Sequence, residues 1–114
     1  EFAPGLVLTL RDAVHLMIVV SDNTAANLVI DRLGTDAVNA RMDALGLPQT
    51  RLLRKVGGGG TSRAGAEPAN QPFGLGVSPS REMVGLLEKL ERGEVLLKTE
   101  LIRRESCGGP GSRR

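Results

Sequence analysis

The sequence predicts a mainly α protein, a helical bundle without a β-sheet. Apolar residues recur at spacings of three and four in successive segments, which is the period of an α-helix. Helix-capping residues and glycines separate these segments, as at the ends of helices in folded proteins. No segment shows the strict alternation of apolar and polar residues that is typical of a half-buried strand.

The composition limits the size of the protein and the kinds of partner it can bind. A length of 114 residues corresponds to one domain at most. Hydrophobic residues make up 40% of the chain but include only two aromatic ones, Phe2 and Phe73, so the core must be aliphatic. Binding to nucleic acid by base stacking is disfavoured because aromatic platforms are missing and the net charge is only +2. We therefore expect neither a nucleic-acid nor a membrane partner.

The first predicted helix begins after Thr9, a suitable N-cap, and carries Asp12 in its first turn, where the helix dipole favours a negative charge. Apolar residues cover most of its faces up to Val20, so the sequence predicts a buried helix. His15 lies on this helix with no partner at metal-ligand spacing, and we interpret it as a core or interface histidine. We expect no metal and no cofactor.

The second predicted helix runs to Leu33 and stops at Gly34. Between the two helices lie Ser21, Asp22 and Asn23, whose side chains compete with backbone hydrogen bonds and favour caps and turns. The tripeptide is therefore predicted to be a short break. The simplest interpretation is a cap, in which Asp22 or Asn23 accepts hydrogen bonds from the amides that start the second helix.

Three more helical segments follow. Thr35 is the predicted N-cap of a third helix, and Ser78 caps a fourth with Pro79 at its first position. Met83 on that fourth helix is interpreted as core filler. A last apolar helical run covers residues 94–106.

The intervening segment 57–76 contains four successive glycines and is predicted to be a mobile loop. It is not a phosphate cradle, because the Gly-Lys-Ser/Thr ending of such loops is absent. Residues 1–106 are expected to form the domain, and residues 107–114 to be a disordered or vector-derived tail. Cys107 is the single cysteine and cannot form an internal disulfide.

A longer motif surrounds the tripeptide. The string SDNTAAN follows a helix that opens TLRD, precedes LVIDRLG, and is followed by Thr-Arg-Leu at residues 50–52. It closely resembles the class A serine β-lactamases and their penicillin-binding relatives, in which Ser-Asp-Asn is one of three active-site motifs. The resemblance extends from about Leu8 to Leu52, and more loosely to about Leu97. It implies the all-α subdomain of the β-lactamase/transpeptidase-like fold.

The resemblance also implies a role for each residue of the tripeptide. Ser21 corresponds to the family serine whose hydroxyl passes a proton to the leaving ring nitrogen. Asn23 corresponds to the amide that binds the acylamide carbonyl of the substrate and the catalytic lysine, and Asp22 to the partner that fixes the turn. The implied ligand is a β-lactam-like small molecule, and the implied location is periplasmic or secreted, although we recognise no signal peptide at the start of the chain.

The other motifs of the family are missing from these residues. No Ser-x-x-Lys occurs in the chain. Lys98-Thr99-Glu100 is not the Lys-Thr-Gly strand, because its surroundings are helical and glutamate replaces glycine. The family also has a glutamate soon after Thr-Arg-Leu, where this chain has Val56 or a glycine. The nearest candidate, Glu67, is interpreted as a solvated loop carboxylate.

Two functions follow as expectations. In the first, the chain is a fragment of a β-lactamase-like serine hydrolase, inactive alone because the nucleophile motif and the Lys-Thr-Gly strand are absent. In the second, it is a non-catalytic helical bundle that self-associates through exposed apolar helix faces.

Overall fold

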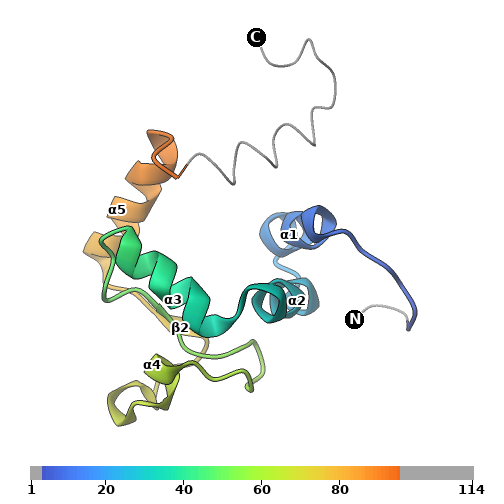
Figure 1. Cartoon of the computed structure of the whole chain (residues 1–114), viewed down its shortest axis with the longest axis horizontal. Helices are drawn as coiled ribbons and strands as arrows, with labels where there is room; N and C mark the ends of the chain where they lie inside the picture. The colour runs from blue at the N-terminus through green and yellow to red at the C-terminus, as the bar shows by residue number, and fades with distance from the viewer. Residues whose placement is uncertain (1–3, 96–114) are drawn as a thin grey trace.

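The computed structural model describes residues 4–95 (Figure 1). It is mainly helical, as the sequence predicts, and contains a minimal two-stranded sheet whose first strand contacts α3 and α4. In chain order the elements are α1 (Leu10–Val19), α2 (Asn23–Leu33), α3 (Thr35–Ala44), β1 (Arg51–Leu52), α4 (Arg63–Ala66), the 3-10 helix η1 (Pro68–Asn70), β2 (Gly76–Val77) and α5 (Ser80–Glu91). The predicted helix at 94–106 and the tail lie, except for residues 94 and 95, outside the described residues.

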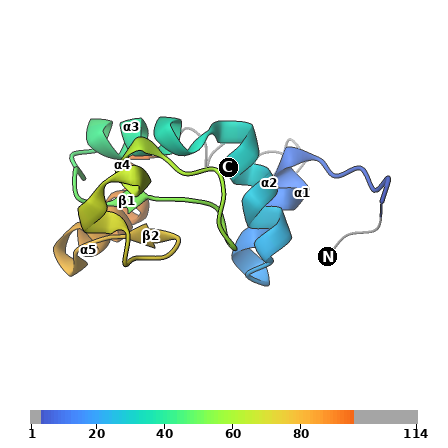
Figure 2. The same ribbon diagram turned by 90° about the horizontal axis from the view of Figure 1, so that it is seen from below.

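Helices α1 and α2 pack against each other and form one end of the molecule (Figures 1 and 2). The small side chains of Ala13 and Ala25 are buried, together with Val29. Small residues at these positions let the two helices approach closely. The predicted cap of α1 is confirmed, because the Thr9 side chain accepts a hydrogen bond from the Asp12 amide at 3.0 Å.

The prediction that α1 is a buried helix is wrong within residues 4–95. Ile18 is 68% exposed and Val19 is 63% exposed. His15 is also exposed and is not a core histidine. The reason is that α2 covers a single side of α1, and within residues 4–95 no other helix packs extensively on it. The apolar pattern shows which faces of α1 are apolar, but it does not show which parts of the protein pack against them.

The second part of the molecule is built around β1. The side-chain amide of buried Asn39 on α3 donates to the Leu52 carbonyl at 2.9 Å, and its oxygen accepts from the Leu52 amide at 2.7 Å. On the other edge, β1 pairs antiparallel with β2, with Leu52 opposite Gly76. The sequence did not predict these strands, because two residues are too few to show an alternating pattern.

Residues 57–76 contain α4 and η1, which their glycine content did not predict. Ser62, 1% exposed, caps α4 by accepting from the Gly65 amide at 3.0 Å, while its hydroxyl donates to the Leu52 carbonyl at 2.8 Å. Arg54 donates to three carbonyls of this segment, those of Gly65, Phe73 and Gly74. Its guanidinium therefore ties the middle of the segment, at Gly65, to the part just before β2.

Helix α5 lies at the opposite end of the molecule from the α1–α2 pair (Figure 2). It begins at Ser80, so Pro79 takes the N-cap position that the sequence assigned to Ser78. Glu82 joins the helix to the segment before β1, because its carboxylate accepts from the Gln49 amide at 3.0 Å and the Thr50 hydroxyl at 2.8 Å. Met83 is 41% exposed and is not the core filler that was expected.

Among the described residues, none of the helices combines the length and the apolar composition that a membrane span requires.

The contact between α4 and β1 generates a first prediction. A Cβ at Gly65 would lie 2.2 Å from the Leu53 carbonyl oxygen, so any side chain must push α4 away from β1. We expect Gly65→Ala to lower the free energy of unfolding by roughly 2 to 4 kcal/mol. Urea unfolding followed by circular dichroism measures this change.

Gly74→Ala is the matched control, because a Cβ at Gly74 has no neighbouring atom within 4 Å. It should change the stability by less than about 0.5 kcal/mol. Equal effects of the two substitutions would contradict the close approach of α4 to β1.

Candidate functional site

Ser21 lies at the junction of α1 and α2 with an unusual backbone conformation. Its φ is 53°, the only positive φ of a non-glycine residue in the described part of the chain. The amides of Val20 and Asp22 both donate to the Leu16 carbonyl, at 3.3 and 3.2 Å, and close the end of α1 around it. Glycine is the usual residue in this left-handed position, because a Cβ is disfavoured there. The steric cost of a Cβ here makes Ser21 a candidate functional residue.

The next two residues start α2. Asp22 is the N-cap, and its carboxylate accepts from the Ala25 amide at 2.8 Å. The interpretation of Asp22 as a cap is therefore confirmed. Asn23 is the first residue of α2, and both its side chain and that of Ser21 are exposed. The tripeptide is the short break that was predicted, with two polar side chains available to a molecule that approaches from outside.

Asn27, one turn further along α2, is a site residue that sequence reasoning missed. Its amide donates to the Val56 carbonyl at 3.0 Å, and its oxygen accepts from the Val56 amide at 2.8 Å. A second contact joins α2 to the segment that contains Val56, because the ammonium group of Lys55 lies 2.9 Å from the carboxylate of Asp31 on α2. The signal was present in the sequence, because Asn23 and Asn27 are spaced to face the same side of a helix.

These contacts bring the segment after Thr-Arg-Leu against the helix that carries the tripeptide. The residue held at the point of contact is Val56, which has no acid-base group. Glu67 lies on the exposed stretch between α4 and η1, as expected for a loop carboxylate. Within the described residues, no group of three His, Cys, Asp or Glu side chains could hold a metal.

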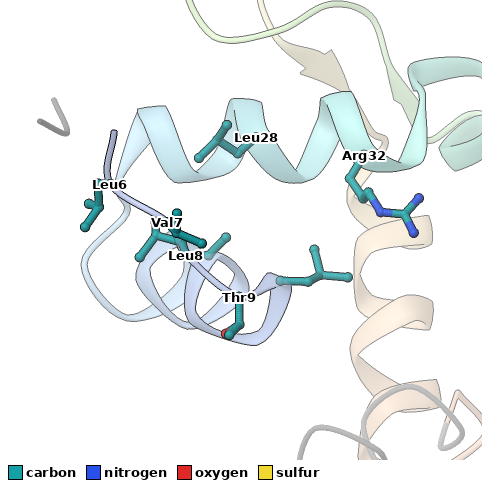
Figure 3. A pocket seen from close by; sticks show the side chains of 8 residues that line it. Leu6, Val7, Leu8, Thr9, Leu28 and Arg32 are labelled. Atoms are coloured by element: carbon teal, nitrogen blue, oxygen red, sulfur yellow. The ribbon is translucent and has the colours of Figure 1, made fainter. Parts of the chain in front are cut away.

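A hollow of about 480 Å³ lies beside α1 and α2 (Figure 3). Its walls come from the segment before α1, from the first turns of α1 and from Leu28 and Arg32 of α2. None of Ser21, Asp22 and Asn23 lines it. We therefore place the candidate site at the tripeptide and not at this hollow.

Comparison with known proteins agrees with this arrangement. A family model described as the β-lactamase enzyme family matches residues 1–102. The chain belongs to the β-lactamase enzyme family. No match was found among curated proteins or among solved structures.

Membership of the β-lactamase family confirms the resemblance that the SDNTAAN string carries, at the level of the family. The family match also covers Thr50-Arg51-Leu52, which contains strand β1 and whose Leu52 amide donates to the side chain of Asn39. The individual roles of Ser21, Asp22 and Asn23 stay predictions, because a family match assigns no chemistry to single residues.

The conformation of Ser21 generates a second prediction. Glycine adopts a φ of 53° without the steric cost that a Cβ imposes. We expect Ser21→Gly to raise the free energy of unfolding by about 1 kcal/mol, whereas Ser21→Ala should leave it nearly unchanged. Chemical unfolding of the three proteins side by side measures the difference.

Ser80→Gly is the control, since Ser80 lies at the start of α5 with an ordinary helical backbone. There glycine should lower the stability by a few tenths of a kcal/mol to about 1 kcal/mol. If Ser21→Gly were also destabilising, the left-handed conformation of Ser21 would be wrong.

The contact of Asn27 with Val56 generates a third prediction. Removing the side-chain amide of Asn27 leaves the backbone N–H and carbonyl of Val56 without their hydrogen-bond partner. We expect Asn27→Ala to lower the free energy of unfolding by about 1 to 3 kcal/mol and to speed hydrogen exchange at the Val56 amide. Asn23→Ala, on an exposed residue of the same helix, should do neither. Unchanged exchange at Val56 in Asn27→Ala would refute the contact.

Proposed function

We propose that this chain supplies the Ser-Asp-Asn wall of the active site in a class A-like serine hydrolase. The reaction proposed for the complete site is the opening of a β-lactam ring through an acyl-enzyme. The observation that carries the proposal is the exposed Ser21, held in a left-handed conformation between two capped helices. A strained backbone at an exposed polar side chain is typical of functional sites.

Each residue of the tripeptide has a part in the proposal. Ser21 delivers a proton to the nitrogen that leaves when the ring opens, and Asn23, two residues on, binds the acylamide carbonyl of the substrate. Asp22 orients both, because its hydrogen bond to the Ala25 amide fixes the turn between them. A positioned proton donor of this kind contributes about 10² to 10⁴ in rate.

The chain alone is proposed to be inactive. Ser21 needs a neighbouring base to tune and reload its hydroxyl, and the family supplies it as the lysine of Ser-x-x-Lys. No Ser-x-x-Lys occurs among these residues, and Lys98-Thr99-Glu100 has a glutamate where a Lys-Thr-Gly strand has its glycine. Both motifs must come from polypeptide outside the 114 residues. The complete protein would act in the periplasm or outside the cell, as members of this family usually do.

Val56 bears on what the complete site does after acylation. The family places a glutamate in this segment to activate the water that releases the acyl group, and neither Val56 nor the glycine after it can replace that carboxylate. Because Asn27 holds the Val56 backbone, a neighbouring carboxylate cannot readily move into its place. The proposal is therefore a site that acylates and turns over slowly.

Intact-mass spectrometry after incubation with a reporter penicillin tests the proposal. The chain alone should show no adduct, because it lacks the nucleophile. A longer polypeptide that adds the Ser-x-x-Lys and Lys-Thr-Gly segments should gain one ligand mass, and Ser21→Ala in it should slow acylation by roughly 10² to 10⁴. Ser80→Ala, a serine on α5, is the matched control and should leave the rate unchanged.

An adduct on the chain alone would show that a serine among these residues is already a nucleophile, and the proposed division of the site would be wrong. An inert longer polypeptide would rule out the hydrolase function.

A second candidate function rests on the small core. Only five hydrophobic residues in the described part of the chain are buried, whereas large apolar side chains are exposed on α1, α2 and α5. Exposed apolar surface of this kind marks an interface. We propose, as the alternative, that the isolated chain is a non-catalytic helical bundle that self-associates.

A further inference from the structure

Helices α1 and α2 form a unit that packs little against the rest of the molecule. The pair buries Ala13, Ala25 and Val29, whereas Leu47 and Leu53 are buried in the body, by which we mean residues 35–77 with α3, β1, α4 and β2. Among the helices and strands of residues 4–95, only α3 makes more than isolated contacts with the pair, and α3 follows α2 directly. An interface this small does not fix the orientation of two units.

Gly34 is the single residue between α2 and α3. Its amide donates to the Ile30 carbonyl at 2.7 Å and its carbonyl accepts from the Val38 amide at 3.2 Å, so it ends one helix and starts the next. Its φ of 88° and ψ of 134° lie in a region that is essentially restricted to glycine. Hinged proteins absorb a change of orientation in a few backbone angles at the ends of elements. Gly34 therefore has the position and the conformation of a hinge.

Two contacts close the α1–α2 unit onto the body at a distance along the chain from Gly34. The Asn27 side chain bonds both backbone groups of Val56, and the Asp31 carboxylate lies 2.9 Å from the Lys55 ammonium group. Asn27 and Asp31 are four residues apart, so they lie on the same side of α2. One side of α2 thus carries both contacts.

A hollow of about 260 Å³ lies where the two units face each other. It is lined by Ile30, Asp31, Gly34 and Thr35 from the α2–α3 junction, and by Lys55, Gly60 and Thr61 from the body. Open space takes the place of apolar packing here, so the polar contacts carry the closure. Water can replace such contacts at a modest net cost, and they therefore open more readily than a packed core.

We infer that the α1–α2 unit is a hinged element that swings about Gly34, and that the contacts of Asn27 and Asp31 are the latch that closes it. Ser21 and Asn23 belong to the moving unit, whereas Val56 belongs to the body. Opening of the latch separates the tripeptide from the segment after Thr-Arg-Leu. The motion does not depend on the proposed hydrolase function, and in a hydrolase it would change the separation of the two sides of the site.

Residual dipolar couplings of the backbone amides, measured on the whole chain, test the latch. In the native sequence the closed state dominates, so one alignment tensor should fit α1 and α2 together with the body. The chain that carries both Asn27→Ala and Lys55→Met should need two different tensors. The matched control carries Asn23→Ala and Lys89→Met, which remove an exposed asparagine of α2 and the ion pair of Lys89 with Glu94. It should keep a single tensor.

A substitution at the hinge tests the coupling of Gly34 to the latch without touching the latch. Alanine disfavours the backbone angles of Gly34, so Gly34→Ala should turn α2 away from the body. We expect amide exchange at Val56 to speed up by about 5- to 150-fold. Exchange at Leu53, whose amide donates to the Leu75 carbonyl within the body, should change less.

Gly46→Ala is the matched control for the hinge, because Gly46 also has a positive φ, of 79°, but lies within the body. It should leave the ratio of the Val56 and Leu53 exchange rates unchanged.

Four outcomes overturn the inference. A native chain that already needs two tensors has no latch, and a latch variant that keeps one tensor is held by packing. Unfolding of α1 and α2 in the latch variant would show that the pair is not a unit. Equal acceleration at Val56 and Leu53 in Gly34→Ala would show global unfolding in place of a hinge. Each result leaves the penicillin experiment untouched, so the hinge and the hydrolase function fail separately.

Discussion

Asparagine side chains hold both ends of the segment from Leu52 to Val56, and the arrangement of the helices depends on that segment. Asn39 of α3 satisfies both backbone groups of Leu52, and Asn27 of α2 satisfies both backbone groups of Val56. An asparagine amide offers a donor and an acceptor side by side, as a neighbouring strand does. Two asparagines thus replace strand partners where helices lie next to the segment.

This constraint also connects the two parts of the molecule. The buried side chains fall into two small groups, one between α1 and α2 and one near β1, which includes Leu47 and Leu53. Apolar packing between the groups is therefore slight, and directional contacts must set their relative position. The contacts of α2 with Lys55 and Val56 do so beside the candidate site.

The sequence predicted the elements better than their surroundings. The caps at Thr9 and Asp22 were predictable because a cap is a local hydrogen bond between residues three apart. The exposure of His15, Ile18 and Met83 was not, because periodicity reports which residues share a face and cannot report what covers that face. The tripeptide was found from its motif, whereas its left-handed serine depends on backbone geometry that no residue type specifies.

The turn at residues 57–60 has a consequence for how this chain can vary. All four of its glycines have positive φ, with values of 85°, 102°, 80° and 57°. The turn therefore has the handedness that D-amino acids prefer, and a ribosomal chain can produce it readily only with its one achiral residue. At Gly57, Gly58 and Gly59 no atom lies within 4 Å of a Cβ position, so there is room for a side chain. A side chain at these three positions is disfavoured by its chirality and not by its size.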